Sequence, residues 1–224
     1  MEVVLGGVPL FSALDAEGAA ALRASMQEVR FGKGDVVFSE GDDGDRLYVV
    51  SDGKIKLGHA ASDGRETLLA VMGPGDMFGE LSLFDPGPRT ATATALTDTV
   101  LLGLHHQALR PWLTGRPEVA EALLQALAQR VRRVNDNLSE LVFSDVPGRV
   151  AKALLDLGEK FGESRADGLF VEHDLTQEEL AQLVGASRET VNKALADFVA
   201  RGWIRLESRS VTITDLERLQ RRAR

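Results

Sequence analysis

The chain has 224 residues, with 26 Lys and Arg against 34 Asp and Glu, a formal net charge of −8, and no cysteine. This length suits one large domain or two ordinary ones, and no apolar run approaches the roughly 18 residues of a membrane span. The lack of cysteine excludes disulfides, thiolate nucleophiles and Cys-ligated zinc or iron–sulfur clusters. Because the acidic start has no basic segment leading into an apolar stretch, the sequence predicts a cytoplasmic protein without a membrane partner.

Over the whole chain, the acidic excess argues against a nucleic-acid partner, because DNA binding requires Lys and Arg opposite phosphates. The charge is unevenly distributed, however. Residues 1–144 carry 13 basic and 20 acidic side chains, whereas residues 185–224 carry 9 basic and 5 acidic ones. The C-terminal end is therefore locally basic, which is compatible with a DNA-binding element there.

The first predicted elements are a helix over about residues 15–26 and a β-rich domain against which it packs. Eleven of the 22 glycines lie between residues 29 and 90, where turns separate short alternating runs. These runs are residues 36–38, 46–50, 54–57 and 67–71. Short strands with turns at this spacing are typical of an antiparallel barrel or sandwich, and residues 90–104 add at least one more strand or pair.

One loop between two of these strands has the residue types of an anion-binding site. Gly79 allows close backbone approach, and Glu80-Leu81-Ser82 can begin a helical turn whose free N–H groups receive an anion. Arg89 supplies a guanidinium for a phosphate, while Glu80 repels a polyanion and accepts a hydrogen bond from a ribose hydroxyl. A cyclic nucleotide, with one phosphodiester charge and a free 2′-hydroxyl, fits both residues. From spacing alone, a surface ion pair between Glu80 and Arg89 is the alternative.

A long helix is predicted after Pro117, because apolar residues step by three and four, and neither Gly nor Pro occurs from Glu118 to Asp145. The heptad residues are Leu124, Leu127, Val131, Val134, Leu138 and Leu141. About 25 residues at 1.5 Å each extend nearly 40 Å, too far for a small barrel to cover, which favours a seam facing a second copy of the chain. The alternative is an amphipathic helix that lies on its own domain.

A second domain is expected after a hinge at residues 144–148. Asp145 is placed to cap the next helix, and Pro147 suits its first turn. The expected elements are a helix over about residues 146–161, a short strand over residues 169–172, two helices and a final hairpin.

The two helices of this domain have the sequence features of a helix-turn-helix. Thr176 and Glu179 form a capping box, Gly185 allows the tight turn, and Ser187 caps the second helix. The exposed face of that helix carries residue types that suit base edges, since Arg bonds guanine and Glu accepts from cytosine N4. The predicted DNA-binding residues are Thr176, Gln177, Ser187, Arg188, Glu189, Thr190, Asn192, Lys193 and, in the turn of the final hairpin, Arg209. The alternative is a helical hairpin with solvated charges.

Two motifs resemble known families. Phe78-Gly79-Glu80-Leu81-Ser82 with Arg89-Thr90-Ala91 resembles the phosphate-binding cassette of cyclic-nucleotide-binding domains, and Arg188-Glu189-Thr190-Val191 resembles the recognition helix of the CRP/FNR transcription regulators. The similarity covers essentially the whole chain and includes segments similar to the CRP-like regulators of actinobacteria. It implies an α+β chain with a jelly-roll-like cyclic-nucleotide-binding β-roll over residues 1–116, a dimerisation helix and hinge over residues 117–144, and a winged helix-turn-helix over residues 145–224.

This resemblance implies cAMP as an allosteric ligand. The implied ligand residues are Gly79, Glu80, Leu81, Ser82, Arg89, Thr90 and, from the long helix, Val134 and Asn135 against the adenine. Asn135 can bond the adenine amino group, but Val134 lacks the polar side chain of the family, so selectivity between cAMP and cGMP is open. Lys193 stands where the best-known members have arginine. An arginine can bond a base with two N–H groups at once, whereas the lysine ammonium acts as a point charge.

The resemblance further implies a parallel homodimer and a switch between two arrangements of its subunits. Its two recognition helices would lie about 34 Å apart and read a palindrome in double-stranded DNA with half-sites resembling TGTGA. RNA polymerase is a further expected partner.

The sequence leaves room for other functions. The four histidines have no metal-ligand spacing, so no metal site is predicted, and a haem sensor, a cGMP-responsive regulator and a regulator active without ligand are alternatives within the family. A cyclic-nucleotide-binding regulatory subunit of an enzyme would need a docking segment in place of the DNA reader. No paired carboxylates or His–Asp cluster indicate catalysis, so the sequence predicts a protein that is not an enzyme.

Overall fold

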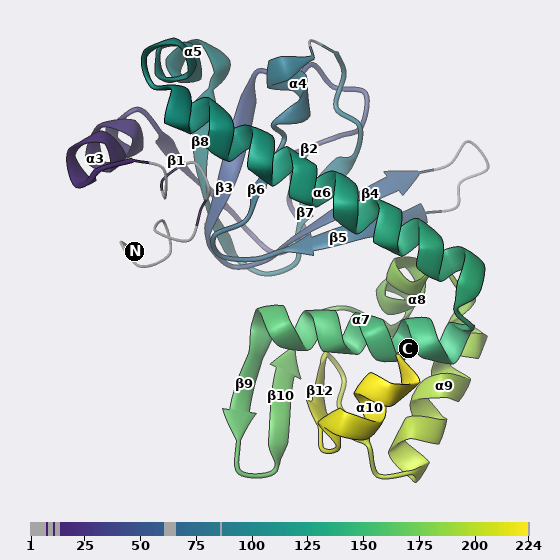
Figure 1. The fold of residues 1–224 in the computed structure, drawn as a ribbon. Coiled ribbons are helices and arrows are strands. Elements are labelled where there is room, and N and C mark those ends of the chain that lie inside the picture. Colours follow the sequence, from purple (N-terminus) through teal and green to yellow (C-terminus); the bar gives the residue numbers. More distant parts are fainter. Residues whose placement is uncertain (1–7, 9–10, 12–13, 61–65, 86, 224) are drawn as a thin grey trace. The chain divides into compact units, whose positions relative to one another are not determined.

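The structure is a computed structural model of residues 1–224, and it describes all of them except residues 1–7, 9–10, 12–13, 61–65, 86 and 224. The chain forms two compact units, one of residues 1–59 with 69–134 and one of residues 60–68 with 135–224. The predicted α+β class is confirmed (Figure 1).

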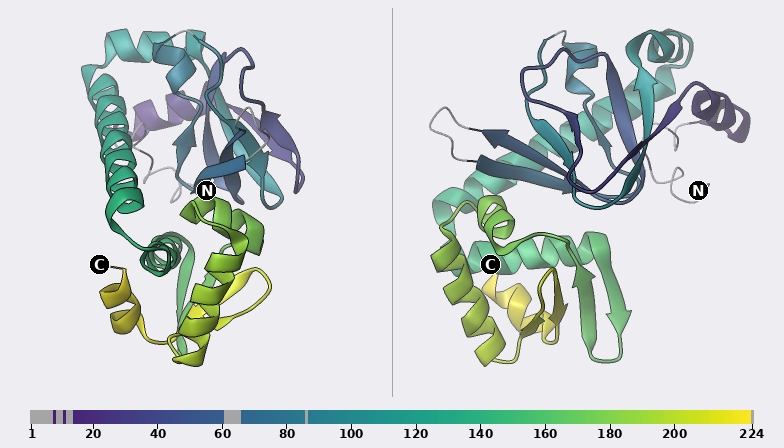
Figure 2. Two further views of the ribbon diagram at one scale, coloured as in Figure 1. Left: turned by 90° about the vertical axis from the view of Figure 1, so that its right-hand side faces the viewer. Right: turned by 180° about the vertical axis from the view of Figure 1, so that it is seen from behind.

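Two four-stranded sheets form the β-roll of the first unit (Figures 1 and 2). One sheet has the order β1 (Gln27–Phe31), β8 (Thr99–His105), β3 (Arg46–Asp52), β6 (Met77–Phe78). The other has the order β2 (Val36–Phe38), β7 (Thr92–Ala95), β4 (Ile55–Ala60), β5 (Glu66–Met72). The pairs β1 with β8, β3 with β8, and β4 with β7 are antiparallel, as the turn spacing predicts.

Strand β3 separates two hydrophobic cores, because successive side chains of a strand point to opposite faces. Leu47 and Val49 join a core with α3 (Ala16–Ala24) and α5 (His106–Gly115). Tyr48 and Val50 join the core between the two sheets. The predicted N-terminal helix is confirmed as α3, with Asp15 as its N-cap.

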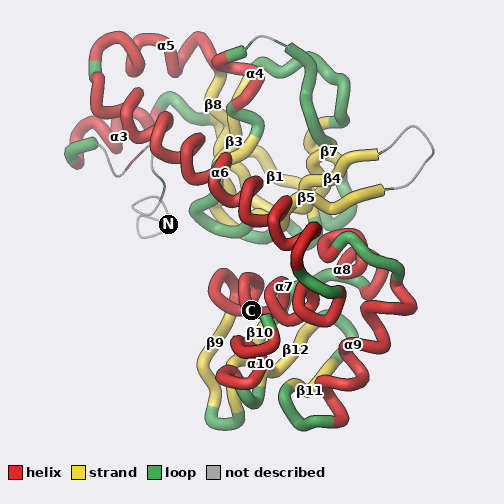
Figure 3. The backbone as a smooth tube through the Cα atoms, turned by 45° about the vertical axis from the view of Figure 1, so that its right-hand side comes forward, coloured by secondary structure: helices red, strands yellow, loops and turns green. Residues whose placement is uncertain are grey.

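Helix α6 (Pro117–Phe143) is one continuous helix of 27 residues (Figure 3), as the heptad pattern predicts. Val119 and Leu123 of its first turns are buried in the core with α3 and α5. The heptad residues after them lie on another face. Five of them, Leu124, Val131, Val134, Leu138 and Leu141, are each more than half exposed. The helix therefore uses one face for its own domain and leaves an apolar seam uncovered in the single chain.

The second unit combines helices with a four-stranded sheet of order β11, β12, β10, β9. Its elements are α7 (Val146–Phe161), β9 (Gly162–Arg165), β10 (Gly168–Glu172), α8 (Gln177–Val184), α9 (Arg188–Ala200), β11 (Ile204–Leu206), β12 (Ser210–Ile213) and α10 (Leu216–Arg222). The predicted cap is present, since the Asp145 carboxylate accepts a hydrogen bond from the Gly148 amide at 2.9 Å. The predicted final hairpin is present as β11 and β12, while β9 and α10 were not predicted.

Candidate ligand and DNA-binding sites

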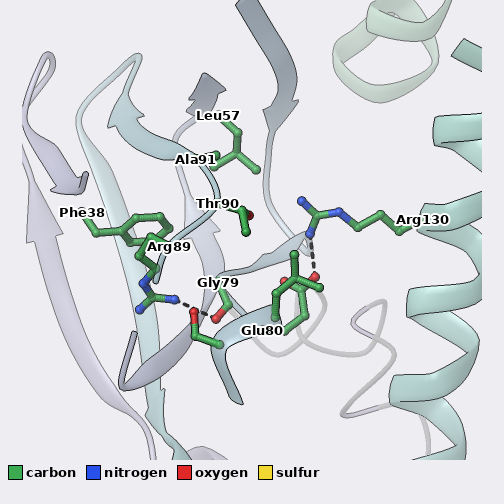
Figure 4. A pocket seen from close by; sticks show the side chains of 10 residues that line it. Phe38, Leu57, Gly79, Glu80, Arg89, Thr90, Ala91 and Arg130 are labelled. Atoms are coloured by element: carbon green, nitrogen blue, oxygen red, sulfur yellow. Dashed lines mark hydrogen bonds and ion pairs between the residues drawn. The ribbon is translucent and has the colours of Figure 1, made fainter. Parts of the chain in front are cut away.

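A pocket of the first unit lies beside the short helix α4 (Leu81–Phe84), between β6 and the chain that returns to β7 (Figure 4). It is lined by Phe38, Leu57, Gly79, Glu80, Leu81, Ser82, Arg89, Thr90, Ala91 and Arg130. The structure therefore brings together six of the eight residues predicted to bind the ligand. The other two, Val134 and Asn135, are exposed on α6 and are not among these lining residues.

Gly79 lines the pocket and Gly44 packs against its Ser82, and neither position has space for a side chain. Gly79 has a φ of +77°, and a Cβ there would lie 2.7 Å from Nη1 of Arg89, so both the conformation and the space require glycine. At Gly44 a Cβ would overlap the side chain of Ser82. The sequence indicates Gly79 through the cassette motif, but it offers no local signal for Gly44, which lies in a different loop.

Arg89 is buried, with 4% of its surface exposed. Its Nη1 donates to the Gly79 carbonyl at 2.7 Å and its Nη2 donates to the Arg46 carbonyl at 2.8 Å. Burial lowers the pKa of the Arg89 guanidinium from its ordinary value, although an arginine remains charged at neutral pH. The site thus holds a buried cation whose planar group is fixed by the backbone.

Glu80 is also buried, with 2% exposed, and its partner is Arg130 of α6 rather than Arg89. Nη1 of Arg130 donates to Oε1 of Glu80 at 2.6 Å (Figure 4). The other carboxylate oxygen, Oε2, is buried and has no hydrogen-bond partner among the described residues. The alternative of a surface ion pair between Glu80 and Arg89 is therefore wrong, because the carboxylate is buried and Arg130 occupies it.

The helix-turn-helix has the caps that the sequence predicts. Oγ1 of Thr176 accepts from the Glu179 amide at 3.1 Å, and Oε2 of Glu179 accepts from the Thr176 amide at 2.8 Å. Gly185 ends α8 in the left-handed conformation, with φ 67° and ψ 45°. Oγ of Ser187 accepts from the Thr190 amide at 3.2 Å and caps α9. These local bonds set the turn that places α9 against α8.

Helix α9 presents a polar face and a buried one. Val191, Ala194, Leu195 and Phe198 are buried, as the sequence predicts. On the opposite face, Arg188, Glu189, Thr190 and Lys193 are exposed and Asn192 is half-buried. Nζ of Lys193 lies 2.7 Å from Oε1 of Glu189, one helical turn apart. The exposed pair is solvated and adds little stability, so both side chains are available to a partner.

Arg209 of the wing is fixed to the segment that precedes α8. Its Nη1 donates to the Asp174 carbonyl at 2.9 Å, and the Asp174 amide donates to the Arg209 carbonyl at 3.0 Å. Thr176 and Gln177, which start α8, are exposed. These bonds join the wing to the start of the helix-turn-helix within the second unit.

Comparison with known proteins agrees with this geometry. The family model of the cyclic nucleotide-binding domain matches residues 28–114, and that of the Crp-like helix-turn-helix domain matches residues 148–222. The whole chain is 57% identical over 224 residues, 100% of both chains, to the CRP-like cAMP-activated global transcriptional regulator of Mycobacterium tuberculosis. The chain belongs to the CRP-like transcriptional regulators. The helical-hairpin alternative and the enzyme-subunit alternative are thereby wrong.

Further similar proteins support this family assignment. The chain is 36% identical to the cyclic AMP receptor protein of Thermus thermophilus over 96% of each chain. It is 26% identical to the structure of the c-di-GMP-responsive global regulator CLP of Xanthomonas campestris, with a TM-score of 0.76 over 89% of this chain and 99% of that one. The chain is a DNA-binding transcriptional regulator with a cyclic nucleotide-binding domain, and it is not an enzyme.

In the described part of the CRP-like regulator, no group of three or more His, Cys, Asp or Glu side chains is placed to hold a metal ion. Among the described helices, none is both long and apolar enough to cross a membrane.

Sequence reasoning missed Arg130, which lies on the long helix of the regulator away from the cassette motif. The signal for it was indirect, because a buried carboxylate requires a cation. Neither the heptad pattern nor the cassette shows which basic residue of the helix supplies that cation.

Proposed function

We propose that this CRP-like regulator is a homodimer that binds cAMP and, in that state, binds a palindromic DNA site. The observation that carries the proposal is the pair of buried charges in one pocket, the Arg89 guanidinium and the Glu80 carboxylate. The M. tuberculosis relative, described as cAMP-activated, supports the choice of nucleotide.

The phosphate and the ribose of the ligand have distinct partners in this proposal. Arg89 bonds the single phosphodiester charge, with Ser82, Thr90 and the backbone around Gly79 and Leu81 beside it. Because Arg130 already occupies Oε1 of Glu80, the buried Oε2 is left to accept a bond from the ribose 2′-hydroxyl. Because Arg130 pairs with Glu80, Arg89 is the cation left for the ligand, which suits a monoanion with a free hydroxyl.

The adenine is assigned to the exposed seam of α6, where Val134 and Asn135 lie. Support for a dimer comes from the uncovered heptad residues of this seam, since a sustained a/d stripe packs best against another helix. In the dimer, Asn135 would serve the adenine amino group, its amide oxygen accepting. Val134 offers only apolar contact, so we assign the choice between adenine and guanine to Asn135.

DNA contacts follow from the exposed face of α9. Arg188 is assigned to guanine and Glu189 to cytosine in half-sites resembling TGTGA, and Lys193 is assigned to the outer bases as a point charge. Thr176, Gln177, Ser187, Thr190, Asn192 and Arg209 complete the DNA-binding set. Two copies of α9 about 34 Å apart would read the two half-sites, and RNA polymerase is the further proposed partner.

Ligand control requires that cAMP bind the two arrangements of the dimer with different affinity, since a ligand with equal affinity for both shifts nothing. We assign the switch to α6 and the hinge at residues 144–148, which connect the two units along the chain. The three-part division at residues 116 and 144 stays a prediction.

A mobility-shift assay tests the proposal. A duplex with two TGTGA-type half-sites is titrated with protein at fixed salt, without ligand and with cAMP, cGMP or c-di-GMP, and a duplex with scrambled half-sites is the control. We expect cAMP to lower the protein concentration needed for half-shift on the palindrome alone. Equal shifts with and without cAMP would contradict ligand control.

A response to another nucleotide is the second candidate. Two observations favour testing it: Val134 provides no hydroxyl, and the X. campestris protein of this fold is described as c-di-GMP-responsive. A shift with cGMP or c-di-GMP but not with cAMP would assign the ligand accordingly.

A further inference from the structure

Phe38 of β2 lines the pocket but has no part in the ligand contacts proposed above. Cζ of Arg89 lies 4.2 Å from the centroid of its ring. We propose that Phe38 is a positioning residue, which holds the Arg89 guanidinium in place for an anionic ligand. The inference rests on the proposed function, because it concerns the phosphate end of the same pocket.

The need for such a residue follows from how Arg89 is surrounded. A buried charge is costly unless it is paired and hydrogen-bonded, and the two hydrogen bonds described for Arg89 go to backbone carbonyls rather than to a carboxylate. The two buried acceptors fix the guanidinium within its plane. They leave its face open to tilting and do not neutralise its charge.

Phe38 restrains the open face of the guanidinium and attracts its positive charge. The negative face of an aromatic ring attracts a cation placed over it, and at 4.2 Å the ring also blocks movement of the guanidinium out of its plane. The ring is itself held, since its centroid lies 6.1 Å from that of Tyr48 and 5.9 Å from that of Phe78. Three aromatic rings, one each from β2, β3 and β6, thus pack together beside Arg89.

This arrangement leaves Nε as the one nitrogen of the Arg89 guanidinium without a described hydrogen-bond partner. Nη1 and Nη2 each donate to a carbonyl, whereas Nε is buried and has no hydrogen-bond partner among the described residues. A phosphate oxygen can accept from Nε without displacing either carbonyl. Phe38 would keep Nε aimed at the position of that oxygen, so its effect on binding should depend on the ligand's charge.

Two other roles of Phe38 predict different results. If the ring only fills the core between the sheets, its replacement lowers stability and affects every ligand equally. If the ring touches the base or the sugar, its replacement weakens a ligand that has no phosphate. Phe31 provides a matched control, because it packs against the same core from β1.

The test combines ligand affinity with the exchange of the Arg89 Nε–H proton. Wild-type protein and the variants Phe38→Leu, Phe38→Tyr and Phe31→Leu are titrated with cAMP by calorimetry and with adenosine by NMR. The exchange rate of the Nε–H with solvent is measured by NMR in the absence of ligand, and thermal unfolding checks that each variant is folded.

Phe38→Leu should weaken cAMP binding about five-fold, as expected for loss of a partly desolvated cation–π contact. It should leave adenosine affinity unchanged and speed exchange of the Arg89 Nε–H, while Phe38→Tyr and Phe31→Leu behave as wild type. Equal losses for cAMP and adenosine, or an unchanged exchange rate in Phe38→Leu, would overturn the inference. If wild type binds no cAMP while Phe38→Leu still speeds the exchange, the proposed ligand fails and the positioning role stands.

Discussion

At the scale of single residues, the pocket shows how burial decides what a charge can do. Glu80 and Arg89 are nine residues apart in one loop, and their types alone are compatible with a solvated pair. In the fold they face separate partners, the carboxylate bonding Arg130 and the guanidinium bonding two backbone carbonyls. Each then retains a buried atom that no described residue bonds, Oε2 of Glu80 and Nε of Arg89, and this pair of atoms defines the chemistry of a ligand.

Replacing Arg89 with Leu should remove most of the affinity for cAMP. Because a hydrogen bond to a charged group contributes about 1.5–3 kcal/mol, we expect a loss of at least roughly 10- to 100-fold by titration calorimetry. Arg110→Leu, at an exposed position of α5, is the matched control and should bind as wild type. Wild-type affinity in Arg89→Leu would remove the proposed phosphate site.

Arg188→Ala should weaken binding to a TGTGA-type palindrome by about 1–3 kcal/mol and barely change binding to scrambled DNA. The reason is that a bidentate contact to guanine reads sequence, whereas a phosphate contact does not. Competition mobility shifts with both duplexes measure this difference. A uniform loss on both would reassign Arg188 to the backbone of the DNA.

The residue scale also shows where sequence reasoning stops. The cassette residues are contiguous or fixed by a short loop, so their clustering could be predicted from the motif. Arg130, Gly44 and Phe38 come from α6, a different loop and β2. Their approach to the pocket depends on sheet pairing and helix docking, which residue spacing within one loop does not encode.

At the scale of elements, the best predictions concern features that depend on three or four neighbouring residues. The caps Asp145, Thr176 and Ser187 each bond an amide three residues ahead, and all are present. Strand β9 and helix α10 were missed because their sequences are mostly polar and exposed, so neither has the apolar period that predicts an element.

Helix α10 nevertheless contacts the junction between α6 and α7. Nη2 of Arg222 bonds both carboxylate oxygens of Asp145, at 2.7 and 2.6 Å, while Asp145 caps α7. From the other side, Arg149 donates to the Ser144 carbonyl at 2.8 Å and to the Val184 carbonyl at 3.0 Å. The hinge is therefore tied both to the last helix and to the end of α8.

Arg222→Ala should lower the free energy of unfolding by about 0.5 kcal/mol, a small value because Asp145 is largely exposed. Arg221→Ala is the control, since Arg221 pairs with the exposed Glu217 of its own helix. The hydrogen bond from Arg222 is the main reason why the pKa of Asp145 lies below its ordinary value of 3.8, and the bond from the Gly148 amide is the second. The pair therefore stabilises the fold above pH 3.8, and this stabilisation is lost as the pH falls through the lowered pKa of Asp145 in the folded state.

Chemical denaturation at pH 7 and at pH 3 measures both effects. The difference between wild type and Arg222→Ala should narrow at the lower pH, as protonation removes the carboxylate that the arginine holds. A difference that is the same at both pH values would show that Arg222 acts through packing rather than through its charge.

At the scale of the whole molecule, the net charge of −8 includes a locally basic C-terminal region, and the heptad residues of α6 form an exposed apolar seam in the single chain. Both features could be predicted because they depend on where charged and apolar residues occur along the chain, and not on which residues touch. The predicted fold class and family are confirmed, whereas the dimer and its DNA spacing stay predictions, because they depend on a second chain.

Leu138→Asp should convert the protein to a monomer at micromolar concentration, because it places a charge at an a/d position of the seam. Sedimentation velocity measures the change, and Val36→Asp, at an exposed apolar residue of β2, is the control. A wild-type monomer under these conditions would contradict the heptad argument, and a dimeric Leu138→Asp variant would place the interface elsewhere.

Gly79 of the pocket and Gly44, which packs behind Ser82, limit how this regulator can evolve toward other signals. At Gly44 and Gly79 there is no room for even one methyl group, so the walls formed by these backbones cannot be remodelled by point substitution. The walls formed by the Leu57 and Ala91 side chains can be remodelled in this way. A library that randomises these two positions, with the glycines and the phosphate contacts kept, is the efficient route to a transcription switch for a different nucleotide.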